Sequence, residues 1–178
     1  MATEEVLVQP ETIAIRHAFE KAIAAPSTKD PTGKLTKQVS PEFILGNTPY
    51  RLEYVFDDSQ TDNDIGKAIV NLVSSSGELI GNNTLSFGKT GEREIMVTPN
   101  LKIEEQFRGR KFGTLLASIS EMVGMHTIES HKRFAHKTVI GIVFDAATIS
   151  GWSSNQAAEH GLKKMGENIW IKTYQKAS

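Results

Sequence analysis

The 178-residue sequence contains no cysteine. That absence excludes disulfides, thiolate metal sites and a cysteine nucleophile. An excess of either charge is missing as well, since 20 basic and 21 acidic residues leave a formal net charge of -1. A chain with so little net charge has no overall field to attract nucleic acid or an anionic membrane surface, so any basic site must be local.

Long apolar runs are also missing, because no segment approaches the ~20 apolar residues that cross a bilayer. The residues from Met1 to Glu5 are acidic and do not place a basic region before an apolar run, as a secretory signal would. We therefore expect a cytoplasmic protein with no membrane partner. The 39% of hydrophobic residues can build a sizeable core, and the length predicts a single domain over residues 1–178.

Hydrophobic periodicity predicts an α/β or α+β domain with a mixed sheet. The expected order is a helix, a long loop or flap, four strands, a helix, a strand, a short helix and a closing strand. In that order these elements are expected at residues 12–25, 27–48, 50–56, 65–73, 78–87, 93–105, 113–124, 138–144, 153–165 and 168–175. Turn-forming residues refine the prediction at three places: Ser74 to Gly77 indicate a hairpin turn, Pro99-Asn100 a bulge or turn inside the fourth strand, and Gly124 a helix end near this residue or shortly after it.

The segment from Gln106 to Thr114 joins a predicted strand to a predicted helix. Its glycines allow the backbone to approach an anion, and the helix dipole favours negative charge at this end. Arg108, Arg110 and Lys111 add three cations within four positions. The pattern indicates a cradle for a pyrophosphate, although an ordinary solvated helix start has the same composition.

Two stretches resemble the GNAT family of N-acetyltransferases. Residues 101–103 (Leu-Lys-Ile) and 108–116 (Arg-Gly-Arg-Lys-Phe-Gly-Thr-Leu-Leu) look like its acetyl-CoA-binding signature, with Lys111 where the family often has glycine. Residues 155–158 (Asn-Gln-Ala-Ala) and 162–166 (Leu-Lys-Lys-Met-Gly) resemble the family's later Asn-x-x-Ala … Lys-x-Gly helix. The resemblance covers residue 93 to the C-terminus.

The resemblance implies a mostly antiparallel, twisted sheet that is flanked by helices and splays between the strands ending near Glu105 and Phe144. It implies acetyl-CoA as co-substrate and direct attack by a primary amine of a small molecule, peptide or protein. Family members often pair as homodimers. Carried over onto this chain, the cofactor-binding residues are Leu101 and Ile103 for the pantetheine, Arg108, Gly109, Arg110, Lys111, Phe112, Gly113 and Thr114 for the pyrophosphate, and Asn155 for the cofactor's arm.

The chain departs from the family at its general acid. Many members place a tyrosine near the end of the later helix, where this chain has Gly161 and Leu162. The adjacent His160 is the candidate for protonating the thiolate, with a solvated histidine as the alternative. Strand-end carboxylates are the candidate proton acceptors, again with a solvated surface role as the alternative: Glu104, Glu105 and Asp145.

Other chemistries fit the sequence less well. His126, His131 and His136 recur at intervals that no helix or strand face brings together, so no metal site is expected. The alternative function is a module with the GNAT fold that binds acyl-CoA without turnover, for sensing or assembly. A phosphate-binding domain for a nucleotide or nucleic acid would need a Gly-Lys-Ser/Thr ending or a basic surface, so no nucleic-acid partner is expected.

Overall fold

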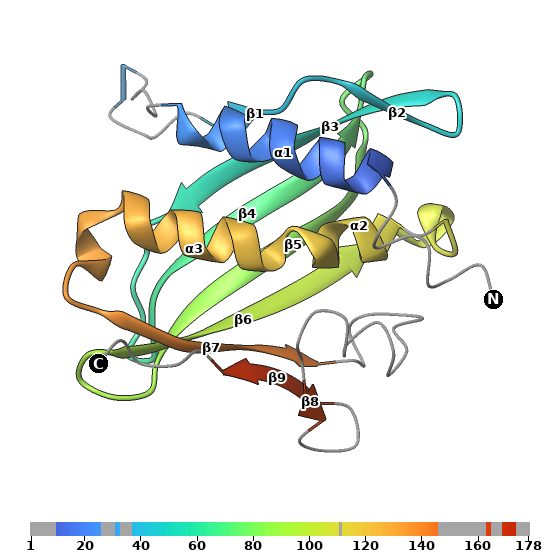
Figure 1. The fold of residues 1–178 in the computed structure, drawn as a ribbon. Coiled ribbons are helices and arrows are strands. Elements are labelled where there is room, and N and C mark those ends of the chain that lie inside the picture. Colours follow the sequence, from blue (N-terminus) through green and yellow to red (C-terminus); the bar gives the residue numbers. More distant parts are fainter. Residues whose placement is uncertain are drawn as a thin grey trace.

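A twisted sheet runs through the chain, with helices on one of its faces (Figure 1). The computed structural model describes residues 10–25, 31–32, 37–110, 112–145, 163–164 and 169–173. The helices are α1 (Pro10–Ala24), α2 (Phe112–Ser118) and α3 (Ser120–Ser130), with the 3-10 turns η1 (Glu105–Phe107) and η2 (Lys132–Phe134). The strands are β1 (Gln38–Val39), β2 (Phe43–Leu45), β3 (Thr48–Asp57), β4 (Asp64–Ser74), β5 (Leu79–Lys89), β6 (Glu94–Ile103), β7 (Thr138–Asp145), β8 (Lys163–Lys164) and β9 (Ile169–Thr173).

The sheet is mixed and mostly antiparallel, as predicted. Its strand order is β1-β3-β4-β5-β6-β7-β9-β8, and β2 pairs with β3 beside β1. Of the pairs that the structure describes, β6 and β7 alone run parallel. Parallel neighbours need a crossover, and α2 and α3 provide it between these two strands.

One hydrophobic core lies between the sheet and the helices. Along β3, β5 and β6 every second side chain is buried, as period-2 alternation requires. The helices cover that face with fully or nearly fully buried apolar groups, among them Phe19, Ile23, Leu116 and Val123. Within the described ranges, no helix is long and apolar enough to cross a bilayer.

The predicted loop over 27–48 is wrong for its second half, because β1 and β2 lie there and β3 begins at Thr48. Both short strands pair with β3, through Gln38↔Tyr54 and Phe43↔Tyr50. Segments of two and three residues are too short to show a period. They exist because β4 pairs with one edge of β3 only, and the other edge offers backbone groups with which short segments can pair.

The helix end predicted at Gly124 is also wrong, since α3 continues to Ser130. Gly124 instead lies on the face of α3 that packs on the sheet. A Cβ at this position would lie 3.4 Å from Val97 Cγ1 and 3.6 Å from Leu85 Cδ2. The glycine therefore marks close packing of the helix on β5 and β6.

The break in the helix occurs earlier, at Ile119 between α2 and α3. Beneath it the fully buried Asn83 of β5 donates from Nδ2 to the Leu116 carbonyl at 3.0 Å and to Ser120 Oγ at 2.7 Å. A side chain that inserts into a helix ladder in this way is a common cause of such breaks. The Asn83 Oδ1 atom has no hydrogen-bond partner within the described part of the chain.

The bulge predicted at Pro99-Asn100 is absent, and β6 is continuous in register with β5 through Leu85↔Pro99 and Thr84↔Asn100. Hydrogen bonds fix the backbone direction, since Glu104 N donates to Ile80 O on the β5 side and Arg93 O accepts from Thr138 N on the β7 side. Because directions alternate along a strand, Pro99 turns its nitrogen away from β5. Its missing N–H therefore removes no bond between β5 and β6.

The end of the short helix predicted over 153–165 is wrong as well. Lys163 and Lys164 form β8, which pairs with β9 at Ile171 and Trp170. Their backbone groups thus belong to a sheet ladder, which outweighs the local helix pattern. Residues 153–162 and 165 lie outside the described residues.

Two of the three spaced histidines, His126 and His131, pack their rings against aromatic side chains of β3. The His126 ring lies 6.1 Å from the Tyr54 ring, and His131 stacks on Phe56 at 4.0 Å. Burial lowers the pKa of His126, which nearby Glu129 partly opposes. Burial and the nearby Arg133 guanidinium lower the pKa of His131.

These shifts predict acid-sensitive stability. Both imidazoles have a lower pKa in the folded than in the unfolded chain, so below about pH 6.5 the unfolded chain binds more protons and the free energy of unfolding falls. We expect His126→Phe/His131→Phe, which keeps the aromatic packing, to flatten this fall between pH 7 and pH 5 in urea titrations. The exposed His17 supplies the control His17→Phe. An unchanged slope in the double variant would contradict the assignment.

Candidate functional site

The two parallel strands part after a short pairing (Figure 1). Their last register pair is Val97↔Ile142. Beyond it β6 continues to Ile103 beside β5, whereas β7 continues beside β9. We call this divergence the strand fork: residues 98–103 of β6, residues 143–145 of β7 and the apex at Val97 and Ile142. It is the splay expected between these strands.

The fork begins next to an irregularity in β7. The register steps from Ile95↔Val139 to Met96↔Gly141, which leaves Ile140 as the extra residue. Bulges bend strands and increase their twist. The distortion associated with the fork thus lies in β7, and not at Pro99.

Backbone N–H groups of β6 face the fork. By the alternation fixed above, Leu101 and Ile103 direct their N–H groups away from β5. In the part of the chain that the structure describes, no strand pairs with β6 on this side beyond Val97. The Ile103 carbonyl accepts a hydrogen bond from Arg108 Nε at 3.2 Å. The Leu101 and Ile103 N–H groups of this edge can donate hydrogen bonds to an extended ligand.

The predicted cradle lies at the wide end of the fork. After η1 the chain turns at Gly109, whose φ of 80° is a conformation that residues with a Cβ rarely adopt. Arg108 and Arg110 are exposed on either side, and the Arg110 guanidinium lies 5.8 Å from the centre of the Phe107 ring. The predicted Lys111 lies outside the described residues.

Helix α2 starts directly behind this turn and is anchored by its first residue. Phe112 is 5% exposed, and its ring lies 5.2 Å from Tyr50 and 6.5 Å from Phe107. The backbone N–H groups of Phe112, Gly113 and Thr114 are in the first turn of the helix, where no helical carbonyl precedes them. This places predicted donors and cations together beside the end of β6.

The predicted proton-transfer residues lie either far from the apex of the fork or outside the described residues. Glu104 and Glu105 come directly after β6, with Glu104 Oε1 3.9 Å from Lys102 Nζ. Glu104 lies seven positions after Val97, so its backbone is ~23 Å from the apex at ~3.3 Å per residue, and Glu105 follows it. The backbone of Asp145 ends β7, but its side chain, like all of Asn155 and His160, lies outside the described residues.

A carboxylate that the sequence did not indicate lies near the apex. Glu121, in the first turn of α3, holds Lys172 Nζ of β9 with both oxygens, at 2.9 and 2.8 Å. Lys172 stands opposite Ile142, the β7 residue of the last pair between β6 and β7. Only the register of β9 on β7 reveals this proximity, because 51 residues separate the two groups.

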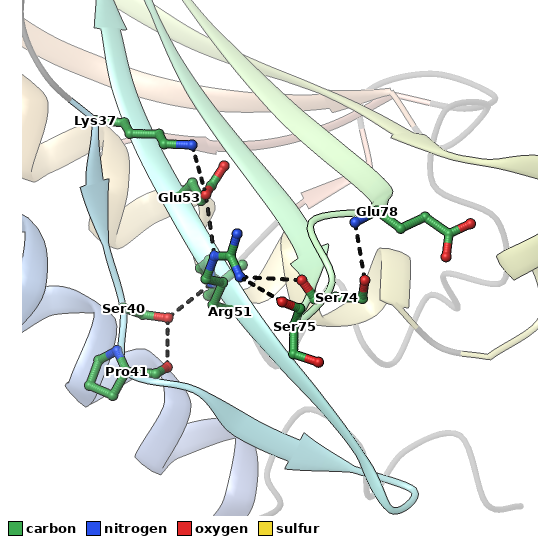
Figure 2. A network of polar contacts seen from close by, with 9 residues as sticks. Lys37, Ser40, Pro41, Arg51, Glu53, Ser74, Ser75 and Glu78 are labelled. Carbon is green, nitrogen blue, oxygen red and sulfur yellow. Dashed lines mark hydrogen bonds and ion pairs between the residues drawn. The ribbon is translucent and has the colours of Figure 1, made fainter.

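A second charged network lies at the opposite edge of the sheet (Figure 2). Glu53 Oε2 accepts from Lys37 Nζ at 3.0 Å and from Arg51 Nε at 3.3 Å. Arg51 also reaches the carbonyl oxygens of Ser74 and Ser75, both at 3.4 Å. The Glu53 side chain is only 9% exposed, so the two cations compensate a nearly buried charge at the β3 edge. No group of three His, Asp or Glu side chains suited to a metal occurs in the described ranges.

Comparisons with known proteins find solved structures that are similar to this chain at low sequence identity. No protein-family model matches the chain, and no curated protein matches it. Solved structures that match include a candidate acetyltransferase from Acinetobacter baylyi, at 15% identity and TM-score 0.42, covering 61% of this chain and 63% of that protein. This chain thus spans less than two thirds of that protein's length. The KacTA–DNA complex matches at 18% identity and TM-score 0.41, covering 64% of this chain and 70% of that one.

A GCN5-related N-acetyltransferase from Kribbella flavida matches over more of the chain, 93% of this one and 94% of that one, at 11% identity and TM-score 0.42. Similarities at this level say nothing about activity or substrate.

Proposed function

We propose that this chain is an acetyl-CoA-dependent N-acetyltransferase that transfers an acetyl group to a primary amine. One observation carries the proposal: a strand edge that no described strand pairs with and a cationic glycine turn adjoin each other. The edge offers the Leu101 and Ile103 N–H groups, and the turn offers Arg108, Arg110 and the first amides of α2. Acetyl-CoA combines the two matching features, a diphosphate and an extended arm with amide groups.

The chain's residues would act mainly by binding and orientation. Arg108, Arg110 and Lys111, with the amides up to Thr114, would neutralise the diphosphate, and Asn155 would contact the arm. The strand edge would align the arm so that the thioester lies toward the apex of the fork. An amine then attacks the thioester carbonyl carbon directly, the C–S bond breaks, and the thiolate leaves.

Two proton transfers accompany this attack. The attacking ammonium must lose a proton, and Asp145, at the end of β7, is the proposed acceptor, directly or through a water. Glu104 and Glu105 lie at the far end of the edge from the thioester, which is too far for this role. His160 is proposed to protonate the thiolate. The acceptor amine belongs to a small molecule, a peptide or a protein, and nucleic acid is not proposed as a partner.

A second function is favoured by one observation, the glycine and leucine at 161 and 162 where the GNAT resemblance leads one to expect a tyrosine. Without a general acid, the fold could serve as an acyl-CoA-binding module for sensing or assembly. Release of free CoA thiol with a panel of amines distinguishes the two. The enzyme releases thiol steadily and depends on the amine, whereas the module binds acetyl-CoA without release.

Reversing the cradle's charge should weaken acetyl-CoA binding. For Arg108→Glu/Arg110→Glu we expect the dissociation constant to rise by about two orders of magnitude, because each charge-assisted hydrogen bond contributes roughly 1.5–3 kcal/mol. Isothermal titration calorimetry measures the change. The matched control is Arg16→Glu/Arg93→Glu, which alters the net charge equally at α1 and before β6. Equal affinities for acetyl-CoA in the wild type and both double variants would contradict a diphosphate site at the cradle.

The conformation of Gly109 should matter for the same ligand. An alanine here disfavours the φ of 80°, so the turn relaxes and redirects the Gly109 and Arg110 amides. We expect Gly109→Ala to bind acetyl-CoA about tenfold more weakly, since restoring the turn costs roughly 1–2 kcal/mol. Gly77→Ala is the control: Gly77 has a φ of 88° and, like Gly109, open space for a Cβ, but lies in the β4–β5 hairpin. Matching losses of affinity in both variants would refute a local role.

A further inference from the structure

Glu121 and Lys172 form an ion pair beside the apex of the fork. Both Glu121 oxygens accept from Lys172 Nζ, at 2.9 and 2.8 Å. The pair is accessible, because the Glu121 side chain is 40% exposed and that of Lys172 is 29% exposed. It joins α3 to β9 and so bridges β7, the strand between β6 and β9 in the sheet.

Along the strand direction, this ion pair lies level with the point where β6 and β7 separate. Lys172 pairs with Ile142, and Ile142 pairs with Val97 as the last residue before the fork. Directly opposite residues share a face of a sheet, so Lys172 faces the helix side, as the buried Val97 and Ile142 do. From Lys172 to the apex is therefore about one to two strand spacings, ~5–10 Å.

Helix α3 carries Glu121 to the same height. Gly124 lies against Val97, and Glu121 is one turn earlier in the helix, toward the wide end of the fork. The carboxylate thus lies above the start of the unpaired edge, unlike Glu104 and Glu105 at its far end. Its place in the first turn of α3 also suits a negative charge.

We propose that Glu121 is the ammonium-binding group of the acceptor site, and that Lys172 occupies its carboxylate when no acceptor is bound. The inference rests on the proposed acetyltransferase function and assigns its acceptor subsite. Lys172 presents a primary ammonium on an alkyl chain, the same group that a primary-amine acceptor brings. An incoming ammonium would exchange one set of N–H···O bonds for an equivalent set. Because ion pairs with such exposure are weak, the lysine is readily displaced.

The proposal predicts opposite effects from the two partners of one ion pair. Lys172→Met frees the carboxylate and should tighten acceptor binding, whereas Glu121→Gln removes the charge and should weaken it. A purely structural ion pair predicts effects of the same sign, because either substitution removes the same α3–β9 link. The sign of the change therefore separates a binding role from a structural one.

The experiment titrates n-butylamine, which reproduces the lysine side chain, into the full chain saturated with CoA. NMR line shifts of the amine give its dissociation constant. We expect about two- to fivefold tighter binding for Lys172→Met and about two- to fivefold weaker binding for Glu121→Gln, which is roughly 0.4–1 kcal/mol in each direction. The neutral analogue n-butanol should not distinguish the three proteins.

The matched control is Lys37→Met, which removes the lysine of a comparable pair, Lys37–Glu53, at the opposite edge of the sheet (Figure 2). It should leave butylamine binding unchanged. Shifts of the same sign for Lys172→Met and Glu121→Gln, or no shift in either, overturn the acceptor subsite. CoA affinity is measured for every variant beforehand: a wild-type protein that does not bind CoA overturns the proposed function as well, whereas normal CoA binding limits the failure to this subsite.

Discussion

The separation of β6 from β7 after Val97 and Ile142 is the constraint on which the rest of the structure depends. A strand edge that leaves its neighbour has backbone N–H groups that must find water, another chain segment or a ligand. Here Leu101 and Ile103 turn those groups into the fork, while β5 holds the other side of the same strand in regular register. Within the part of the chain that the structure describes, this strand is therefore held in register on one edge and unpaired on the other, which suits it to hold an extended ligand.

Packing on the helix face keeps this arrangement in place. At Gly124 α3 packs on β5 and β6, and buried Asn83 ties β5 to the junction between α2 and α3. Phe112 anchors the start of α2 against Tyr50. These contacts fix the turn at Gly109 and the first turn of α2 relative to β6. An anion site and a strand edge can therefore bind the same ligand at once. Pre-organisation of this kind lowers the entropic cost of binding.

Local sequence patterns predicted the helices and strands with clear hydrophobic periodicity. The remaining features depend on contacts between segments that are far apart in the sequence. Strands β3 to β7 follow from their β-branched and aromatic runs. Pro99 and Gly124 misled because proline and glycine signal breaks locally, whereas their roles come from neighbours: Pro99 turns its nitrogen away from β5, and Gly124 packs on Val97. The proposed cradle could be predicted from sequence because its residues are consecutive. Glu121 and Lys172 could not, because only the register of β9 on β7 brings them together.

Residue-resolved hydrogen exchange of the β6 amides tests the central claim most directly. With saturating acetyl-CoA, exchange at Leu101 and Ile103 should slow by at least about tenfold, which corresponds to roughly 1.4 kcal/mol of added protection. Lys102, whose N–H already points to β5, serves as the internal reference and should change little. Unchanged exchange at Leu101 and Ile103 in the acetyl-CoA-bound protein would contradict a strand edge that binds the thioester's arm.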